Sequence, residues 1–218
     1  GVVDVGNEGG AVLRVGPSQI CFHGPNILGH AKWLLWGPTA HTKENVMTQQ
    51  VTFWFDVSCP FCWLTSRWIK EVEQVRDIEV EWVPMSLSVL NDGRDLSETY
   101  ARMMEANWGP ARVFTKVKDE FPDKIDELYT MMGTLVHTEG QGGKQGFGGY
   151  DEIIGVALDA VGLPPQLADV ANSEVVDDQL RAYHQQAMDN VGDEVGTPVV
   201  KLGDTAFFGP VITRVPKG

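Results

Sequence analysis

The sequence predicts an α/β fold in which a large all-helical insertion separates a β-α-β unit from a C-terminal β-hairpin. Three observations lead to this prediction. Residues 51–87 read as strand, helix and strand, residues 95–190 carry helical periods, and residues 197–212 contain two short strand-like runs. The order of these patterns along the chain is typical of one sheet with a long helical excursion between its first and last strands.

The β-α-β unit is the clearest of the three. "VTFWFDV" (51–57) is a run of β-branched and aromatic residues, as in a buried strand. From Pro60 to about Val75 apolar residues recur at helical spacing, and a proline suits the first helical turn because its missing N–H is not needed there. "IEVEWVPMSL" (78–87) alternates like a second strand. Two strands joined by a helix predict a parallel pair with a right-handed crossover.

The insertion and the hairpin follow. Gly140–Gly149 is rich in glycine and is expected to be a connecting loop, with a mobile lid as the alternative. Within residues 197–212 a Gly-Asp turn joins two short strands, which predicts a β-hairpin. The helical segments are expected near residues 97–108, 110–119, 123–139, 150–161, 164–171 and 173–191.

These patterns divide the chain into four expected parts. Residues 1–46 hold eight glycines and three prolines without a sustained period, and they are expected to be a poorly ordered or non-native extension. An ordered strand over residues 11–15 is the alternative. Residues 47–94 form the first half of the sheet domain, residues 95–191 the helical insertion or cap, and residues 192–218 the C-terminal hairpin.

The composition and charge of the chain argue against several classes of function. The net charge is −13, and an acidic domain repels phosphate backbones, which argues against nucleic-acid binding. No apolar run approaches the roughly 20 residues that span a bilayer, so no membrane association is expected. The N-terminus shows no signal-peptide pattern, and we expect a cytoplasmic protein.

The candidate reactive residues are Cys59 and Cys62, which form a C-x-x-C pair. Zinc would need four ligands, and the sequence has neither a second C-x-x-C nor an H-x₃₋₅-H, so no metal is expected. A structural disulfide would close a very short loop and stabilise little. A redox role has a mechanism, because Cys59 falls where a strand ends and a helix begins, and a helix N-terminus stabilises a thiolate. Cys59 would attack a disulfide or an electrophile and form a mixed adduct. Cys62 would then displace the adduct and close the Cys59–Cys62 bond. C-x-x-C beside β-α-β is the thioredoxin-type signal.

A second feature stands far along the chain. Thr197-Pro198 opens the hairpin, and in thioredoxin-like folds a cis-proline at this position faces the C-x-x-C pair. A cis X-Pro bond costs little beyond trans. We therefore expect a cis bond here; an ordinary trans proline at the start of a strand is the alternative.

The sequence resembles a known family over residues 51–218. The matching blocks are "FWFDVSCPFCWLTSRWI", "VPMSLSVLN", "YTMMGTLVH", "NVGDEVGTPVV" and "AFFGPVITRVPKG". They are similar to the actinobacterial mycothiol-dependent nitroreductases, which are DsbA-like thioredoxin-fold proteins with a helical insertion. The family pair is usually C-P-W-C, and Phe61 replaces that Trp here. The family also continues past "PKG", so the final C-terminal helix of the thioredoxin fold is expected to be absent.

The resemblance implies a cytosolic oxidoreductase with no bound cofactor. Its reductant would be mycothiol or another low-molecular-weight thiol, its substrates small disulfides or electrophilic, nitroaromatic compounds, and a mycoredoxin-like protein a further reductant. Cys59 carries over as the attacking thiol and Cys62 as the resolving thiol. The surrounding active-site loops would comprise Pro60, Phe61, Thr197 and Pro198.

Four further residues are candidate substrate contacts, each with a structural alternative. Trp63 could border the pocket or pack in the core, and Asn91 could bind substrate or shape a turn. Tyr100 has the spacing of a packing residue, and His137 could interact with a helix C-terminus. Rival functions are a kappa-type glutathione transferase or FrnE-like isomerase, which need no resolving thiol, and a non-catalytic thioredoxin-fold binding module.

Overall fold

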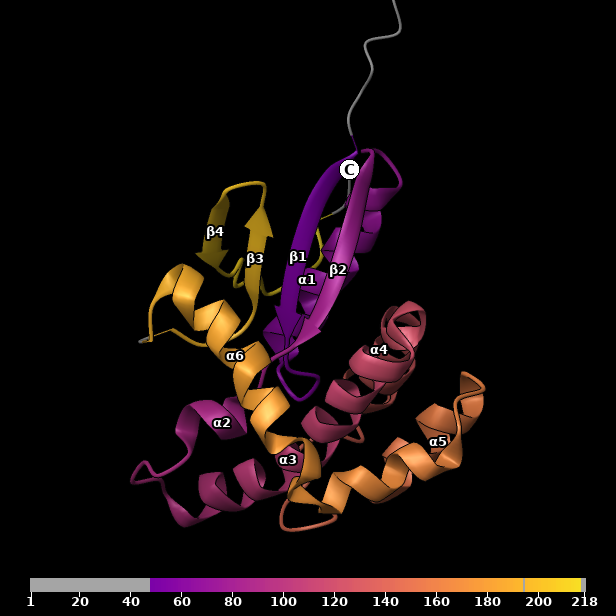
Figure 1. The fold of residues 1–218 in the computed structure, drawn as a ribbon, viewed down its shortest axis with the longest axis vertical. Helices are drawn as coiled ribbons and strands as arrows, with labels where there is room; N and C mark the ends of the chain where they lie inside the picture. The colour runs from indigo at the N-terminus through magenta and orange to yellow at the C-terminus, as the bar shows by residue number, and fades with distance from the viewer. Residues whose placement is uncertain (1–47, 194, 217–218) are drawn as a thin grey trace, which may run out of the picture. The chain divides into compact units, whose positions relative to one another are not determined.

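The computed structural model describes residues 48–193 and 195–216, so the expected N-terminal extension, residues 1–46, lies outside the described residues. The sheet has the strand order β2-β1-β3-β4. β1 runs parallel to β2 and antiparallel to β3, and β3 pairs antiparallel with β4 (Figure 1). The predicted parallel pair and C-terminal hairpin are therefore confirmed. The strands are β1 (Gln49–Phe55), β2 (Ile78–Pro84), β3 (Val199–Leu202) and β4 (Thr205–Phe208).

β1 is a central strand that is buried on both faces. Because side chains alternate along a strand, Phe53 and Phe55 face one side of the sheet and Trp54 the other. The phenylalanines join the larger core, to which helix α1 (Pro60–Glu73) contributes. Trp54 packs in a second cluster with residues of helix α6 (Asp177–Val191). Figure 1 accordingly shows α1 behind the sheet and α6 in front of it.

The helical insertion lies between β2 and β3. Within the described residues no helix is both long enough and apolar enough to cross a membrane. One helix, α6, packs on β2 and β4, so the expected cap of residues 95–191 includes an element that covers the sheet. The remaining helices are α2 (Leu87–Asn91), α3 (Glu98–Glu120), α4 (Ile125–Gly133) and α5 (Asp151–Ala160), with 3₁₀ turns at Pro122–Lys124, Pro165–Asn172 and Glu174–Val176 and a π-helical turn at Thr134–Thr138.

Helix α3 is continuous, and the prediction of two separate segments near residues 97–108 and 110–119 was wrong. A proline inside a helix removes one hydrogen bond and costs about 3 kcal/mol or more. Burial offsets that cost here, because the residues next to Pro110 are buried, from Gly109 through Thr115. This part of α3 also lies against Ala171, since a Cβ atom added at Gly109 would meet the Cβ atom of Ala171 at 3.6 Å, an ordinary van der Waals distance. Tertiary packing therefore overrides the local preference for a break.

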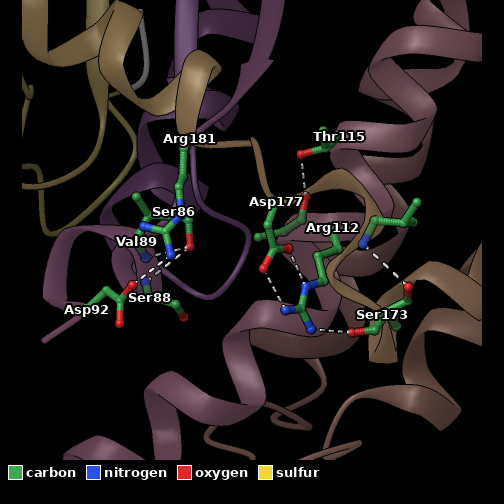
Figure 2. Close-up of polar contacts among 12 residues, drawn as sticks. Ser86, Ser88, Val89, Asp92, Arg112, Thr115, Ser173, Asp177 and Arg181 are labelled. Carbon is green, nitrogen blue, oxygen red and sulfur yellow. Dashed lines mark hydrogen bonds and ion pairs between the residues drawn. The ribbon is translucent and has the colours of Figure 1, made fainter. Parts of the chain in front are cut away.

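A buried ion pair fixes α3 to the start of α6. The Nε and Nη2 atoms of Arg112 donate to the two carboxylate oxygens of Asp177 at 2.7 and 2.9 Å (Figure 2). Its Nη1 atom donates to the backbone oxygen of Ala171 at 3.2 Å. Arg181 pairs with Asp92 at 2.6 Å, which links α6 to the turn after α2. These contacts hold the helices that surround the C-terminal ends of β1 and β2.

Candidate active site

Cys59 stands at the N-terminal end of α1, as predicted. It is the N-cap residue, with extended backbone angles, and Pro60 occupies the first helical turn. The backbone N–H of Cys59 donates to the carbonyl of Asp56 at 3.1 Å, which closes the turn between β1 and α1. The thiol therefore lies at the positive end of a helix, where negative charge is favoured.

The Cys59 thiol faces the loop that precedes β3. Its Sγ atom donates to the backbone oxygen of Thr197 at 3.7 Å. A hydrogen bond from the thiol of Cys62, assisted by the Thr197 side chain, lowers the pKa of Cys59 to about 7 despite the opposing effect of burial. About half of the Cys59 thiol is therefore ionised near neutral pH, which suits a nucleophile.

Cys62 has the opposite character. It is fully buried on the inner face of α1, and it is a free thiol like Cys59. Burial, followed by the proximity of Cys59, raises the pKa of Cys62 well above that of an ordinary thiol. The pair thus combines one thiol that ionises readily with one that stays protonated. Among the described residues, His, Cys, Asp and Glu side chains form no group of three that could hold a metal ion.

The loop opposite the thiols contains the predicted cis bond. The Thr197–Pro198 peptide is cis, and so is Gly209–Pro210. The two proline segments are joined, because the N–H of Gly209 donates to the carbonyl of Pro198 at 2.8 Å. The hydroxyl of Thr65 on α1 donates to the carbonyl of Pro210 at 2.7 Å. The hairpin is thereby tied to the helix that carries the cysteines.

Asp56 is a site residue that the sequence reasoning missed. One carboxylate oxygen accepts from the backbone N–H and the hydroxyl of Ser58, at 2.8 and 2.7 Å. The other accepts from the N–H of Leu87 at 2.7 Å. Burial raises the pKa of Asp56, and its charge in turn raises the pKa of Cys59. A carboxylate directly after the apolar run "VTFWF" is the signal that could have identified it.

Trp63 and His137 lie together beside the thiols. The rings are nearly parallel, with centroids 5.9 Å apart. The Nε2 atom of His137 lies 2.8 Å from the carbonyl of Val57, in the turn that leads to Cys59. His137 belongs to the π-helical turn after α4, and such turns are frequent at functional sites. Burial lowers the pKa of His137, so the ring is neutral near pH 7.

The remaining predicted residues are Phe61, inside the C-x-x-C loop, and Asn91 and Tyr100, on α2 and α3. Phe61 projects at the surface, with 38% of its area exposed. The amide of Asn91 donates to the carbonyl of Leu87 at 2.8 Å, one turn back in α2. Tyr100 is exposed in the first turn of α3. Among the described residues, no hydrogen bond connects Asn91 or Tyr100 to the dithiol, so the structure groups Trp63 and His137 with it but not these two.

The chain was compared with known proteins. The family described as Rv2466c-like, mycothiol-dependent nitroreductase Rv2466c, matches residues 58–218. The uncharacterized protein Rv2286c of Mycobacterium tuberculosis is 29% identical over 170 residues, which cover 77% of this chain and 70% of that protein.

Solved structures show the same fold. DsbA from Chlamydia trachomatis aligns with a TM-score of 0.53 and 15% identity, over 87% of this chain and 91% of that one. A 2-hydroxychromene-2-carboxylate isomerase also aligns with a TM-score of 0.53 and 15% identity, over 73% and 88%. At such identities the likeness establishes a DsbA-like thioredoxin fold and nothing about the reaction.

Proposed function

The chain belongs to the family of Rv2466c-like mycothiol-dependent nitroreductases, and we propose that it is a cytosolic thiol-disulfide oxidoreductase whose reductant is mycothiol. Its substrates would be small disulfides or small electrophiles, including nitroaromatic compounds. The observation that carries this proposal is the contrast within the dithiol. Cys59 has a lowered pKa and contacts the loop at Thr197, whereas Cys62 is fully buried and its pKa is raised.

Oxidation of the dithiol follows from this contrast. The Cys59 thiolate attacks one sulfur of a disulfide R–S–S–R′ and forms a mixed disulfide with R, while R′–S⁻ leaves and takes up a proton. Cys62 then loses its proton and attacks the Sγ atom of Cys59. The Cys59–Cys62 disulfide forms, R–S⁻ leaves and is protonated, and the substrate has gained two electrons.

Two molecules of mycothiol restore the dithiol. The thiolate of the first attacks Cys59, and Cys62 leaves and is protonated. The thiolate of the second attacks the mycothiol sulfur of this mixed disulfide, which releases the Cys59 thiolate and oxidised mycothiol. Cys59 is the better point of attack, because it retains 4% of its area exposed at the helix terminus, whereas Cys62 has none.

The surroundings of Cys59 would orient the substrate. We assign this role to the Trp63–His137 pair and to the exposed ring of Phe61, with Asn91 and Tyr100 as outer contacts. Pro198 would hold an extended substrate across from Cys59. A mycoredoxin-like protein remains a second proposed reductant that would approach the same end of α1.

The test is turnover of a small disulfide with mycothiol and, separately, with glutathione as the reductant. The proposal expects faster turnover with mycothiol and no turnover in Cys59→Ser. Equal rates with both thiols would contradict the mycothiol assignment. Full activity in Cys62→Ser would instead favour a kappa-type transferase or an isomerase-like enzyme, which needs no resolving thiol.

A further inference from the structure

Arg67 is a positively charged residue of α1 that the proposed reaction does not use. Cys59, Trp63 and Arg67 follow one another at intervals of four residues, so they lie on one side of the helix. The backbone N–H of Trp63 donates to the carbonyl of Cys59 at 3.2 Å, which places these two residues in consecutive turns. At 1.5 Å per residue, Arg67 lies about 12 Å along the helix from Cys59.

The guanidinium of Arg67 lies over the ring of Trp63. Its central carbon is 4.3 Å from the ring centroid, which is a cation–π contact. The same indole ring is nearly parallel to the ring of His137, with centroids 5.9 Å apart. Because Trp63 precedes Arg67 by one turn, this contact turns the Arg67 side chain back toward the end of α1 that carries the dithiol.

Most of the hydrogen-bonding capacity of Arg67 is unused. Its Nε atom donates to the hydroxyl of Ser66 at 3.2 Å, and its Nη2 atom donates to the hydroxyl of Thr130 at 3.0 Å. A guanidinium has five N–H donors. Within the described part of the chain, three of them therefore have no protein acceptor.

Arg67 also has no carboxylate partner within the described part of the chain. Glu73 and Asp126 act on its charge from further away. Both of these carboxylates bind Lys70 instead, at 2.6 and 2.7 Å. The charge of Arg67 is therefore available to a negative group from outside the protein.

Two other arginines show that this state is not general. Arg112 and Arg181 also lie over a tryptophan ring, that of Trp108, but each forms an ion pair with an aspartate. Arg67 is partly buried without such a pair, and burial is the main cause that lowers its pKa. A cation that has lost part of its hydration gains more from an approaching anion than a fully hydrated one does.

We propose that Arg67 is a specificity residue that binds a carboxylate of the disulfide substrate, so that the protein favours acidic disulfides. This inference rests on the proposed function and names a substrate class for the same site. A guanidinium fits a carboxylate through paired N–H donors. The carboxylate lies one to two helical turns, about 5–11 Å, from the sulfur that Cys59 attacks. Arg67 makes and breaks no covalent bond, and thiol-disulfide exchange proceeds at Cys59 as described above.

The test is the second-order rate constant for the attack of Cys59 on two reagents, measured by rapid mixing near neutral pH. 5,5′-Dithiobis(2-nitrobenzoate) carries two carboxylates, whereas 4,4′-dithiodipyridine is uncharged. Each variant is compared with the parent for the same reagent, so that the different reactivities of the two disulfides cancel. All proteins carry Cys21→Ser, which leaves Cys59 and Cys62 as the only thiols.

Three substitutions separate the effects of charge, shape and position. Arg67→Gln removes the charge, and Arg67→Lys keeps the charge without the planar group. Arg76→Gln is the matched control, because it removes the same charge from an exposed position just after α1. There, the Nη1 atom of Arg76 donates to the carbonyl of Val75 at 2.8 Å.

In Arg67→Gln the rate with the dicarboxylate reagent should fall roughly 10-fold, as for loss of a hydrogen bond between charged groups. The rate with dithiodipyridine should be unchanged. Arg67→Lys should lie between the parent and Arg67→Gln, and Arg76→Gln should match the parent.

Equal losses with both reagents in a folded Arg67→Gln protein would assign Arg67 to packing alone. An equal loss with the dicarboxylate in Arg76→Gln would show a general effect of charge. Either result overturns the inference and leaves the proposed function standing. Reaction of Cys59→Ser with both reagents at the parent rate would overturn the proposed function itself.

If the Arg67 variants do not fold, the parent protein decides. 2-Nitrobenzoate carries the same carboxylate without a sulfur atom, so it competes for Arg67 and cannot react with Cys59. It should slow the reaction of Cys59 with the dicarboxylate reagent more than sodium chloride does at the same ionic strength. Equal effects of the two salts overturn the inference.

Discussion

The Sγ atom of Cys59 donates a hydrogen bond to the backbone oxygen of Thr197 over 3.7 Å, although the two residues are 138 positions apart. The parallel pairing of β1 with β2 and the antiparallel pairing of β1 with β3 bring them together. Cys59 follows β1, and Thr197 precedes β3, so both lie at the same end of neighbouring strands. The candidate site is therefore a product of the sheet, and the helical insertion adds residues around it.

Replacing Thr197 with valine should raise the pKa of Cys59 above about 7, because the buried Thr197 hydroxyl has no other hydrogen-bond partner and helps to lower that pKa. The rate of Cys59 alkylation by iodoacetamide, followed against pH, measures this pKa. Thr197→Ser keeps the hydroxyl and should keep the parent profile. An alkylation midpoint in Thr197→Val equal to that of the parent would show that the hydroxyl has no such effect.

Gly133→Ala should destabilise the protein by about 1–3 kcal/mol, the usual cost of overpacking. A Cβ atom at this position would lie 2.5 Å from ring atoms of Trp63, which cannot move without displacing His137 and Tyr129. Urea unfolding measures the change. Gly155→Ala in α5 is the matched control, because its Cβ would meet no atom within 4 Å. It should stabilise the helix by up to about 1 kcal/mol, and equal effects of the two substitutions would refute the packing argument.

The sequence predicts those features of the fold and the site that depend on neighbouring residues in the chain. Cys59 at a helix start and Thr197-Pro198 before a strand are local patterns with a chemical meaning, and both were predicted. Tyr129 was not singled out, because an aromatic residue at helical spacing is ordinary core, and only the folded structure shows that it packs against Trp63 beside the dithiol. The continuity of α3 through Pro110 was missed for the same reason, since burial by distant residues decides it.

Asp177→Asn should destabilise the protein by about 3–5 kcal/mol, because it leaves the buried charge of Arg112 without its partner. The Arg112 side chain is only 9% exposed and that of Asp177 17%, so water replaces the carboxylate incompletely. The free energy of unfolding in urea gives the value. For comparison, Glu120→Gln breaks an exposed i,i+4 pair with Lys116 and should cost about 0–1 kcal/mol. Similar losses of unfolding free energy in the two variants would contradict a larger contribution from the Arg112–Asp177 pair.

His184 should make stability depend on pH. Burial, with a smaller effect of Arg181, lowers the pKa of His184 from 6.5 to about 4, and its Nδ1 atom accepts from the N–H of Ser86 at 3.4 Å. Asp193, after the end of α6, acts in the opposite direction. At pH values between about 4 and 6.5, His184 binds a proton in the unfolded chain but not in the folded protein. Stability should therefore fall as the pH falls through this window.

Urea unfolding at about pH 7 and about pH 5 measures this dependence, which should amount to roughly 2 kcal/mol for His184. His184→Gln cannot bind the proton and should lose that part of the dependence, while the contributions of carboxylates remain. The same pH dependence in the parent and in His184→Gln would refute the assignment.

The measurement that tests the central claim most directly is mass spectrometry of Cys59→Ser and Cys62→Ser, each combined with Cys21→Ser so that one cysteine remains, after incubation with oxidised mycothiol. Cys62→Ser should carry one mycothiol on Cys59 as a stable mixed disulfide, because the resolving thiol is missing. Cys59→Ser should carry none, since Cys62 is fully buried and its pKa is raised. A mycothiol adduct on Cys62, or no adduct on Cys59, would contradict the assignment of Cys59 as the attacking thiol.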